Sequence, residues 1–231
     1  MARVPEMKLD FTAILARWQM LLDGMALTIQ LAVITILTGF LIGTACAIAR
    51  RSRFKLPATI AAVYVELIRN TPFLVQIFVV YFGLSSLGFK FTAVTVAIIA
   101  LTINVGAYTA EIMRAGFDSI HRGQWEAAEC LGLTRVQAYW HVALLPAMER
   151  IYPSLTSQFI LLMLASSITS QISVEELTAA ANFIQSETYR PLETYIVIAI
   201  IYLALSLALR LAFWLLGMLI FPRRRRLGTN L

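Results

Sequence analysis

Two pairs of opposite charges border apolar stretches of the sequence: Glu66 with Arg69, and Glu111 with Arg114. Both pairs are spaced three residues apart, so on a helix their side chains share a face and can form an ion pair. Charges close to a bilayer core are costly and indicate either function or pairing. One interpretation is an interfacial ion pair that fixes the depth of each helix. The other, for Glu66 and Arg69, is a pathway for a zwitterion.

The polar run Asn70-Thr71-Pro72 follows Arg69 directly. Pro72 lacks a backbone N–H and breaks helical hydrogen bonding, and neighbouring polar groups can satisfy the freed carbonyl. Because transporters often expose backbone at a broken helix that lines a cavity, this region is a candidate substrate pathway. Its residues are Glu66, Arg69, Asn70, Thr71, Pro72 and, about one turn later on the same face, Gln76.

A second polar patch, at residues 165–171, contains Ser166 and Ser167 within an otherwise apolar stretch. Hydroxyl and small side chains permit tight helix packing, which is the simpler interpretation. The alternative adds both serines to the substrate pathway. Gly39 and Gly43, four residues apart in the first apolar stretch, are a further signal of close helix packing.

Catalytic and cofactor-binding patterns are missing from the sequence. No glycine is followed by Lys-Ser or Lys-Thr, so there is no P-loop to hold phosphates. His121 and His141 have no Ser, Cys or carboxylate at a spacing typical of a catalytic triad. Cys46 and Cys130 have no metal-ligand spacing, and we expect no disulfide between them. We therefore expect no enzyme activity, metal or cofactor in this chain.

The composition indicates which elements position these residues. The chain has 231 residues, of which 59% are hydrophobic and 14% charged, whereas an average soluble domain is about 45–50% apolar and 25% charged. A folded chain of this length still exposes about a quarter to a third of its surface, so a soluble fold cannot hide this many apolar side chains. The sequence therefore predicts an integral membrane protein and excludes soluble enzymes and nucleic-acid binders, despite a net charge of +6.

A hydrocarbon core of ~30 Å requires ~20 helical residues to cross it. Such stretches predict an all-α fold with five transmembrane helices, at residues 24–49, 70–89, 91–110, 151–174 and 194–221. Apolar residues 56–67 are expected to lengthen the second helix. Residues 1–23 lack the pattern of a cleavable signal peptide and are expected to form a periplasmic segment with a short interfacial helix.

Lysines and arginines in the short loops predict the orientation. Basic clusters follow the first and fifth stretches, and four arginines lie between the third and fourth, whereas the loop after the fourth is acidic. The N-terminus is therefore expected in the periplasm and the C-terminus in the cytoplasm. The basic tail 222–231 is then a cytoplasmic anchor and not a nucleic-acid-binding patch.

The polar connection 111–150 falls on the cytoplasmic side in this arrangement. We expect a short helix that starts after Gly123, has Glu126 in its first turn and ends at Gly132. A second helix is expected to start at Thr134 and to break at Pro146. From the residues alone, the first helix is either a docking element or a solvated loop helix without a partner.

The block Glu126-Ala127-Ala128, with Gly132 and Val142 at fixed offsets, resembles the EAA loop of the membrane subunits of ABC importers. That pattern continues with Leu-Pro, and here Pro146 comes one residue late. The resemblance extends over residues 24–219. Features that resemble the polar amino acid branch of the family are the run 64–72 with Gln76, Gly123-Gln124-Trp125 and Arg190-Pro191.

The resemblance implies the type I ABC importer transmembrane fold, with a permease domain at 24–221 and two such subunits side by side. It implies a multi-pass permease of the bacterial inner membrane that moves a polar amino acid, or a related amine or opine, from periplasm to cytoplasm. It assigns coupling to an ATPase to the loop 111–150. The coupling residues are Gln124, Trp125, Glu126, Ala127, Ala128 and Gly132.

The implied partners are a second permease subunit, two ATPase subunits that carry ATP and Mg, a periplasmic amino-acid-binding protein and membrane lipid, but no nucleic acid. Relatives often have Lys and Asp or Asn where Met163, Leu164 and Ala165 stand here. This difference favours a heterodimer in which the other permease supplies the substrate-binding polar residue. The alternative function is a self-sufficient ion-coupled carrier or channel, which would need a charged relay in several spans and usually an internal repeat; the sequence has neither.

Overall fold

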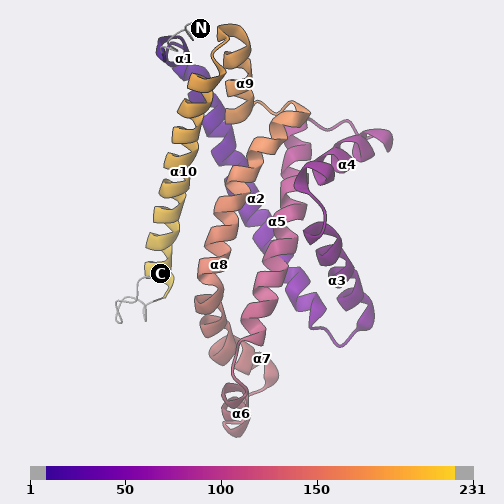
Figure 1. Ribbon diagram of the computed structural model, residues 1–231. Coiled ribbons are helices and arrows are strands. Elements are labelled where there is room, and N and C mark those ends of the chain that lie inside the picture. Colours follow the sequence, from indigo (N-terminus) through magenta and orange to yellow (C-terminus); the bar gives the residue numbers. More distant parts are fainter. Residues whose placement is uncertain (1–8, 222–231) are drawn as a thin grey trace, which may run out of the picture.

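The computed structural model describes residues 9–221, which form an all-helical fold as predicted (Figure 1). Its elements are α1 (Thr12–Leu15), α2 (Trp18–Arg50), α3 (Lys55–Arg69), α4 (Phe73–Ser86), α5 (Ala93–Asp118), α6 (Arg122–Cys130), α7 (Arg135–Ala138), η1 (Tyr139–Ala143), α8 (Leu144–Ala165), η2 (Ser166–Ile172), α9 (Leu177–Thr188) and α10 (Pro191–Ile220). η1 is a π-helical turn and η2 is a 3-10 helix. Residues 1–8 and the tail 222–231, including the expected cytoplasmic anchor, lie outside the described residues.

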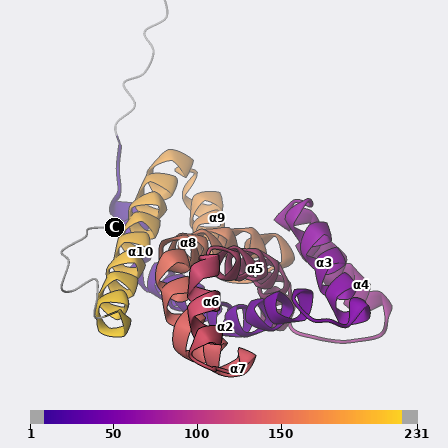
Figure 2. The ribbon, with the colours of Figure 1, turned by 90° about the horizontal axis from the view of Figure 1, so that it is seen from below.

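Helix α5 is the centre of the bundle. α2 and α8 pack on α5, and α3 and α4 contact it from another side, whereas α10 packs on α8 and α9 (Figure 2). The buried core runs along α5 and includes Leu101, Val105 and Met113, with Leu155 and Phe159 from α8. Most of α10 is exposed apolar surface within this chain, as expected for a helix that faces lipid or another subunit.

Two glycines allow α2 to pack closely against α5. A Cβ on Gly39 would lie 2.1 Å from Cγ1 of Val105, and a Cβ on Gly43 would lie 2.5 Å from Cβ of Thr109 and 2.7 Å from the carbonyl oxygen of Gly106. Real side chains do not approach so closely, so only glycine fits these positions. The predicted small-residue packing is therefore confirmed, and backbone contact replaces side-chain interdigitation along this crossing.

Four helical stretches are long and apolar enough to cross a membrane: Trp18–Arg50, Ala93–Asp118, Val136–Ile172 and Pro191–Ile220. They contain most of the expected first, third, fourth and fifth spans. Residues 56–67 were expected to lengthen the second helix, and this expectation is wrong, whereas the break expected at Pro72 is confirmed. α3 and α4 are separate helices bent by 115° across residues 70–72, and the number of spans is five if the bent pair counts as one.

Helix α9 closes the end of the bundle that holds α1 (Figure 1). Glu176 precedes α9 and is fully buried, and its carboxylate accepts hydrogen bonds from the backbone N–H groups of Thr178 at 3.0 Å and Ala179 at 3.1 Å. The Tyr202 hydroxyl of α10 donates to the same carboxylate at 2.8 Å. Burial raises the pKa of the Glu176 carboxyl, although these hydrogen bonds favour its ionised form. Glu176 thereby joins the start of α9 to α10.

Candidate functional site

Helix α6 carries the Glu-Ala-Ala block and has defined ends. The His121 ring precedes it and accepts a hydrogen bond from the Gly123 N–H at 3.2 Å, so α6 starts at Arg122, slightly earlier than expected. Gly132 has a φ of +69°. The N–H of Leu133 donates to the Ala128 carbonyl at 3.1 Å, which is the hydrogen bonding of a glycine-terminated helix. The prediction that Gly132 ends this helix is confirmed.

The predicted coupling residues of α6 fall on two faces. Gln124, Glu126 and Ala127 are exposed, whereas Ala128 is buried. Trp125 turns inward, and its ring meets the Tyr139 ring of η1 edge-on, with centroids 4.9 Å apart. The exposed face can therefore contact another protein, while Trp125 and Ala128 fasten α6 to its own chain.

The segment after α6 forms one continuous helical stretch through Pro146, so the expected break at Pro146 is wrong. Thr134 does start this stretch as predicted: its Oγ1 accepts from the Gln137 N–H at 3.4 Å, and the Gln137 side chain accepts from the Thr134 N–H at 2.9 Å. The Leu144 N–H donates to the Tyr139 carbonyl five residues back. This π turn shifts the hydrogen-bond register just before Pro146. The helix therefore continues beyond Pro146, although proline has no backbone N–H to donate.

The same π turn explains the late position of Pro146. A π turn contains one more residue than an α-helical turn between hydrogen-bonded groups. η1 therefore accommodates the one residue by which this chain exceeds the Leu-Pro spacing of the EAA pattern. α8 continues from η1 without an interruption.

A charge cluster lies around Glu111 near the end of α5. Its carboxylate accepts from Arg50 of α2 at 2.7 Å and from Arg114, and Arg69 of α3 lies 3.7 Å away. The predicted pair of Glu111 with Arg114 is confirmed. The predicted pair of Glu66 with Arg69 is wrong, because Arg69 faces Glu111 while the Glu66 carboxylate accepts from the Asn70 amide at 3.1 Å.

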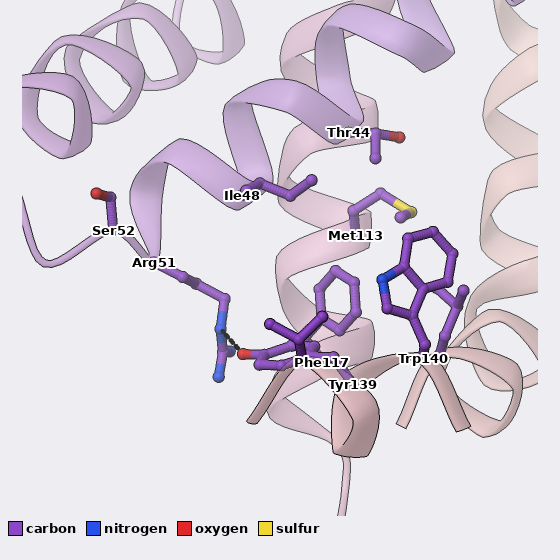
Figure 3. Close-up of a pocket in the computed structure, with 10 residues that line it drawn as sticks. Thr44, Ile48, Arg51, Ser52, Met113, Phe117, Tyr139 and Trp140 are labelled. Carbon is purple, nitrogen blue, oxygen red and sulfur yellow. Dashed lines mark hydrogen bonds between the residues drawn. The ribbon is translucent and has the colours of Figure 1, made fainter. Parts of the chain in front are cut away.

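The cluster continues to η1. Arg114 binds Asp118 at 2.7 Å, and Asp118 binds Arg51 at 2.5 Å. Nε of Arg51 donates to the Tyr139 hydroxyl at 3.2 Å, as Figure 3 shows. A cavity of about 500 Å³ lies beside this contact. Its walls are Thr44, Ile48, Arg51, Ser52, Met113, Phe117, Val136, Tyr139, Trp140 and Leu144.

The break between α3 and α4 is held by Gln76, which is buried. Its amide nitrogen donates to the carbonyl of Ile68 in α3 at 2.7 Å and to that of Thr71 in the bend at 2.9 Å. Its amide oxygen accepts from the Asn104 side chain of α5 at 2.8 Å. Gln76 thus supplies the polar groups that the interrupted helix needs. Other candidate pathway residues at the bend are exposed: Glu66, Arg69, Asn70, Thr71 and Pro72.

The two candidate serines lie in η2, which contacts α4 and α5. Ser166 is buried and its hydroxyl donates to the Met163 carbonyl at 2.6 Å, and the Ser167 hydroxyl donates to the Leu164 carbonyl at 2.7 Å. Both hydroxyls are thus bonded to the last turn of α8, which η2 continues. The structure does not bring these serines into hydrogen-bonding contact with the residues of the bend.

Sequence reasoning missed several partners in the charge cluster. The Arg114–Asp118 pair has the i,i+4 spacing of a helical ion pair and could have been predicted from it. Arg50, Arg69 and Tyr139 reach the cluster from other parts of the chain, and no local signal marks them. Within the residues that the structure describes, no three His, Cys, Asp or Glu side chains gather as metal ligands.

Comparison with known proteins places this geometry in a family. The family model described as "Binding-protein-dependent transport system inner membrane component" matches residues 37–220. The chain belongs to this family. The chain is 35% identical over 221 residues to the octopine transport system permease protein OccM of Rhizobium radiobacter, covering 91% of this chain and 90% of that protein.

Two further similarities agree with this family membership. The probable glutamine ABC transporter permease protein GlnM of Bacillus subtilis is 36% identical over 192 residues, covering 83% of this chain and 89% of that protein. A crystal structure of an amino acid ABC transporter with histidines matches with a TM-score of 0.86 and 37% identity, covering 92% of this chain and 99% of that one. The chain is thus an ABC transporter permease subunit and not an enzyme, and a self-sufficient carrier is not favoured.

Proposed function

We propose that this permease carries a polar amino acid, or a related amine or opine, from the periplasm to the cytoplasm, driven by separate ATPase subunits. The observation that carries the proposal is α6, a helix of nine residues with Glu126 and Ala127 exposed and Trp125 anchored inward. An exposed helix fixed to its own chain can transmit a push from a docked protein. The substrate class is supported by relatives that are named for octopine and glutamine transport.

The coupling residues divide into two roles in this proposal. Gln124, Glu126 and Ala127 contact the ATPase, and the other three shape and hold the helix that presents them. Those three are Trp125, Ala128 and Gly132. ATP and Mg bind to the ATPase subunits, because the P-loop pattern is missing from this sequence.

We further propose the assembly and its orientation. Two ATPase subunits dock on the cytoplasmic side of a bacterial inner membrane, and a periplasmic binding protein delivers the substrate to the other side. The orientation is supported by basic residues at and just after the end of α2: Arg50, Arg51 and Arg53. A heterodimer with a different permease is supported by the apolar residues 163–165, which provide no charged group for a substrate.

The substrate pathway is proposed to pass the bend between α3 and α4. Glu66, Asn70 and Thr71 are exposed there and offer both charge and hydrogen-bonding groups. Gln76 supports the bend from inside, so its effect on transport is indirect. Ser166 and Ser167 contribute through the packing of η2.

The test is ATP hydrolysis by the complex in lipid nanodiscs. The chain is co-expressed with the permease and ATPase encoded beside it, and the binding protein is added with each of a panel of amino acids and opines. One of them should stimulate hydrolysis, and Glu126→Lys should remove the stimulation. Glu129→Lys, the same charge change on the same helix, is the control and should retain most of it.

Two results would contradict the proposal. If no ATPase co-purifies and no amino acid or opine stimulates hydrolysis, the importer function is wrong. If Glu126→Lys and Glu129→Lys lose stimulation equally, the net charge of α6 matters and the specific role of Glu126 is wrong.

A further inference from the structure

The Glu111 carboxylate is shared by arginines from three helices. Arg50 comes from the end of α2, Arg69 is the last residue of α3, and Arg114 follows one turn later on α5. The Glu111 side chain is only 20% exposed, so these contacts are partly shielded from water. Ion pairs that are shielded in this way are stronger than those on an open surface.

On one side, Glu111 reaches the bend of the broken span. Arg69 ends α3, and the next three residues make up the bend. Because Arg69 faces Glu111 and not its helical neighbour Glu66, the charge at this end of α3 is held by α5. A displacement of α5 at Glu111 therefore changes the ion pair that holds Arg69 at the α3 end of the bend.

On the other side, Glu111 reaches α6 through an unbroken series of contacts. Arg114 binds both Glu111 and Asp118, Asp118 binds Arg51, and Arg51 donates to the Tyr139 hydroxyl. Tyr139 in turn packs against Trp125 of α6. Most of these contacts are charge-assisted hydrogen bonds, which hold both distance and direction.

Two features allow this series of contacts to take more than one arrangement. The cavity beside Tyr139 and Trp140, about 500 Å³ in volume, leaves one side of η1 without packed atoms, so η1 can move into it (Figure 3). Two carboxylates, those of Glu111 and Asp118, are shared among several guanidinium groups. An arginine can therefore exchange one carboxylate for the other while both remain paired, which is the discrete change of state that coupling requires.

We infer that Glu111 is the positioning residue through which movement of α6 reaches the bend between α3 and α4, an inference that rests on the proposed function, in which an ATPase moves α6. Glu111 touches neither nucleotide nor ATPase in this role. It keeps Arg69 and Arg114 on one carboxylate, so that the end of α3 follows the cytoplasmic loop.

The test uses the complete complex in nanodiscs with its binding protein. Glutamine, arginine and octopine are added one at a time, because relatives of this chain are named for transport of these compounds. Glu111→Gln should still bind the ATPase and hydrolyse ATP at the basal rate. Its stimulation in nanodiscs, and its substrate uptake after reconstitution into proteoliposomes, should fall roughly tenfold, a typical size for coupling between sites. Arg51→Gln removes the contacts of Arg51 with Asp118 and Tyr139, nearer to α6, and should give the same result.

The control is Arg53→Gln, which removes a positive charge from the loop between α2 and α3, as Arg51→Gln does. The Arg53 guanidinium lies over the Phe54 ring and forms no ion pair among the residues that the structure describes. This variant should keep stimulation and uptake. Glu111→Asp retains a carboxylate and should recover part of what Glu111→Gln loses.

A distance measurement separates transmission from mere stability. Spin labels on the exposed positions Leu67→Cys of α3 and Leu203→Cys of α10, with Cys46 and Cys130 replaced by serine, report the position of α3 with and without vanadate-trapped nucleotide. The label distance should change in the parent protein and in Arg53→Gln. It should stay constant in Glu111→Gln although ATP is still hydrolysed.

Three results lead to different conclusions. Parent-like stimulation and a parent-like distance change in Glu111→Gln would overturn the role of Glu111. Loss of ATPase binding in both Glu111→Gln and Arg51→Gln would also overturn it, because the cluster would then serve assembly alone. A parent complex that no member of the full panel of amino acids and opines stimulates would overturn the proposed function itself.

Discussion

The Trp125 ring of α6 lies edge-on to the Tyr139 ring of the π turn, with ring centroids 4.9 Å apart. Phe117 of α5 extends this contact, since its ring centroid lies 5.9 Å from that of Tyr139. α6 is thus fastened to the core by aromatic rings, while its opposite face stays exposed. A helix held in this way is presented in one orientation to a protein that docks on it.

Trp125→Ala should weaken binding of the ATPase subunit by roughly threefold to tenfold, because an aromatic pair contributes about 0.5–1.5 kcal/mol beyond its buried area. The measurement is titration of the ATPase onto the permease in nanodiscs. Trp125→Phe keeps a ring and should bind nearly normally. Trp18→Ala, which changes an exposed tryptophan at the start of α2, just after α1, is the control. Unchanged binding by Trp125→Ala would contradict the anchoring role.

Gly43→Ala should destabilise the protein by about 1–3 kcal/mol, the usual cost of overpacking. The new Cβ would meet Thr109 Cβ at 2.5 Å and the Gly106 carbonyl oxygen at 2.7 Å, and a backbone oxygen cannot turn away as a side chain can. The matched control is Gly83→Ala in α4, where the new Cβ would meet no atom within 4 Å apart from the local helix backbone. This control should be neutral or slightly stabilising, because alanine favours helix. Thermal unfolding in detergent measures both, and equal midpoints would contradict the close crossing of α2 and α5.

Deletion of His141 should leave a folded, functional permease. His141 is exposed in the middle of η1, and removal of one residue turns a π turn into an α-helical turn without rotating the helix that follows. Deletion of Leu161, inside α8, is the control: it rotates the rest of the helix by about 100° and should prevent folding. The yield of monodisperse protein and its ATPase stimulation measure the outcome. Equal damage from both deletions would show that η1 does not absorb the extra residue.

Glu176→Gln should remove a pH-dependent part of the stability. Because the pKa of Glu176 is raised in the folded protein, that protein holds a proton that the unfolded chain releases. Stability should therefore fall as pH rises from the ordinary carboxyl range through the raised pKa. Glu176→Gln should flatten this slope, whereas Glu175→Gln, at the exposed neighbouring position, should not. Thermal unfolding over a pH series measures the slopes, and identical slopes in all three proteins would contradict the effect of burial.

The long helices were predictable because a bilayer requires long apolar stretches, and because a helix pairs its own backbone N–H and C=O groups by hydrogen bonds where no water is present. The ends of α6 were nearly as predictable, since Gly132 provides a local signal for a helix end. The break at Pro72 was predictable from the missing N–H, but its sharpness was not. The bend depends on Gln76 and on Asn104, whose side chain comes from another helix.

Long-range partners account for the failures. Spacing along one helix predicted that Glu66 binds Arg69, but the fold offers Arg69 the carboxylate of Glu111, which is 42 residues away in the sequence. Glu176 belongs to the acidic loop after the fourth predicted span, but in the fold α2 and α10 pack against it, and the hydroxyls of Thr28 and Tyr202 approach its carboxylate. Pro146 predicts the end of a helix because it lacks an N–H, but the π turn before it, which carries no local signal in the sequence, lets the helix continue.

The length of α2 has a consequence for how the protein sits in its bilayer. Its 33 residues extend about 50 Å at 1.5 Å per residue, well beyond the ~30 Å thickness of a hydrocarbon core. A helix that exceeds the local thickness tilts or projects into the headgroups, and α2 runs obliquely across the bundle in Figure 1. Because Gly39 and Gly43 fix where α2 touches α5, a thinner or thicker bilayer changes the tilt of both helices together. The hydrophobic thickness of the bilayer therefore acts on the crossing of α2 and α5 at the centre of this permease.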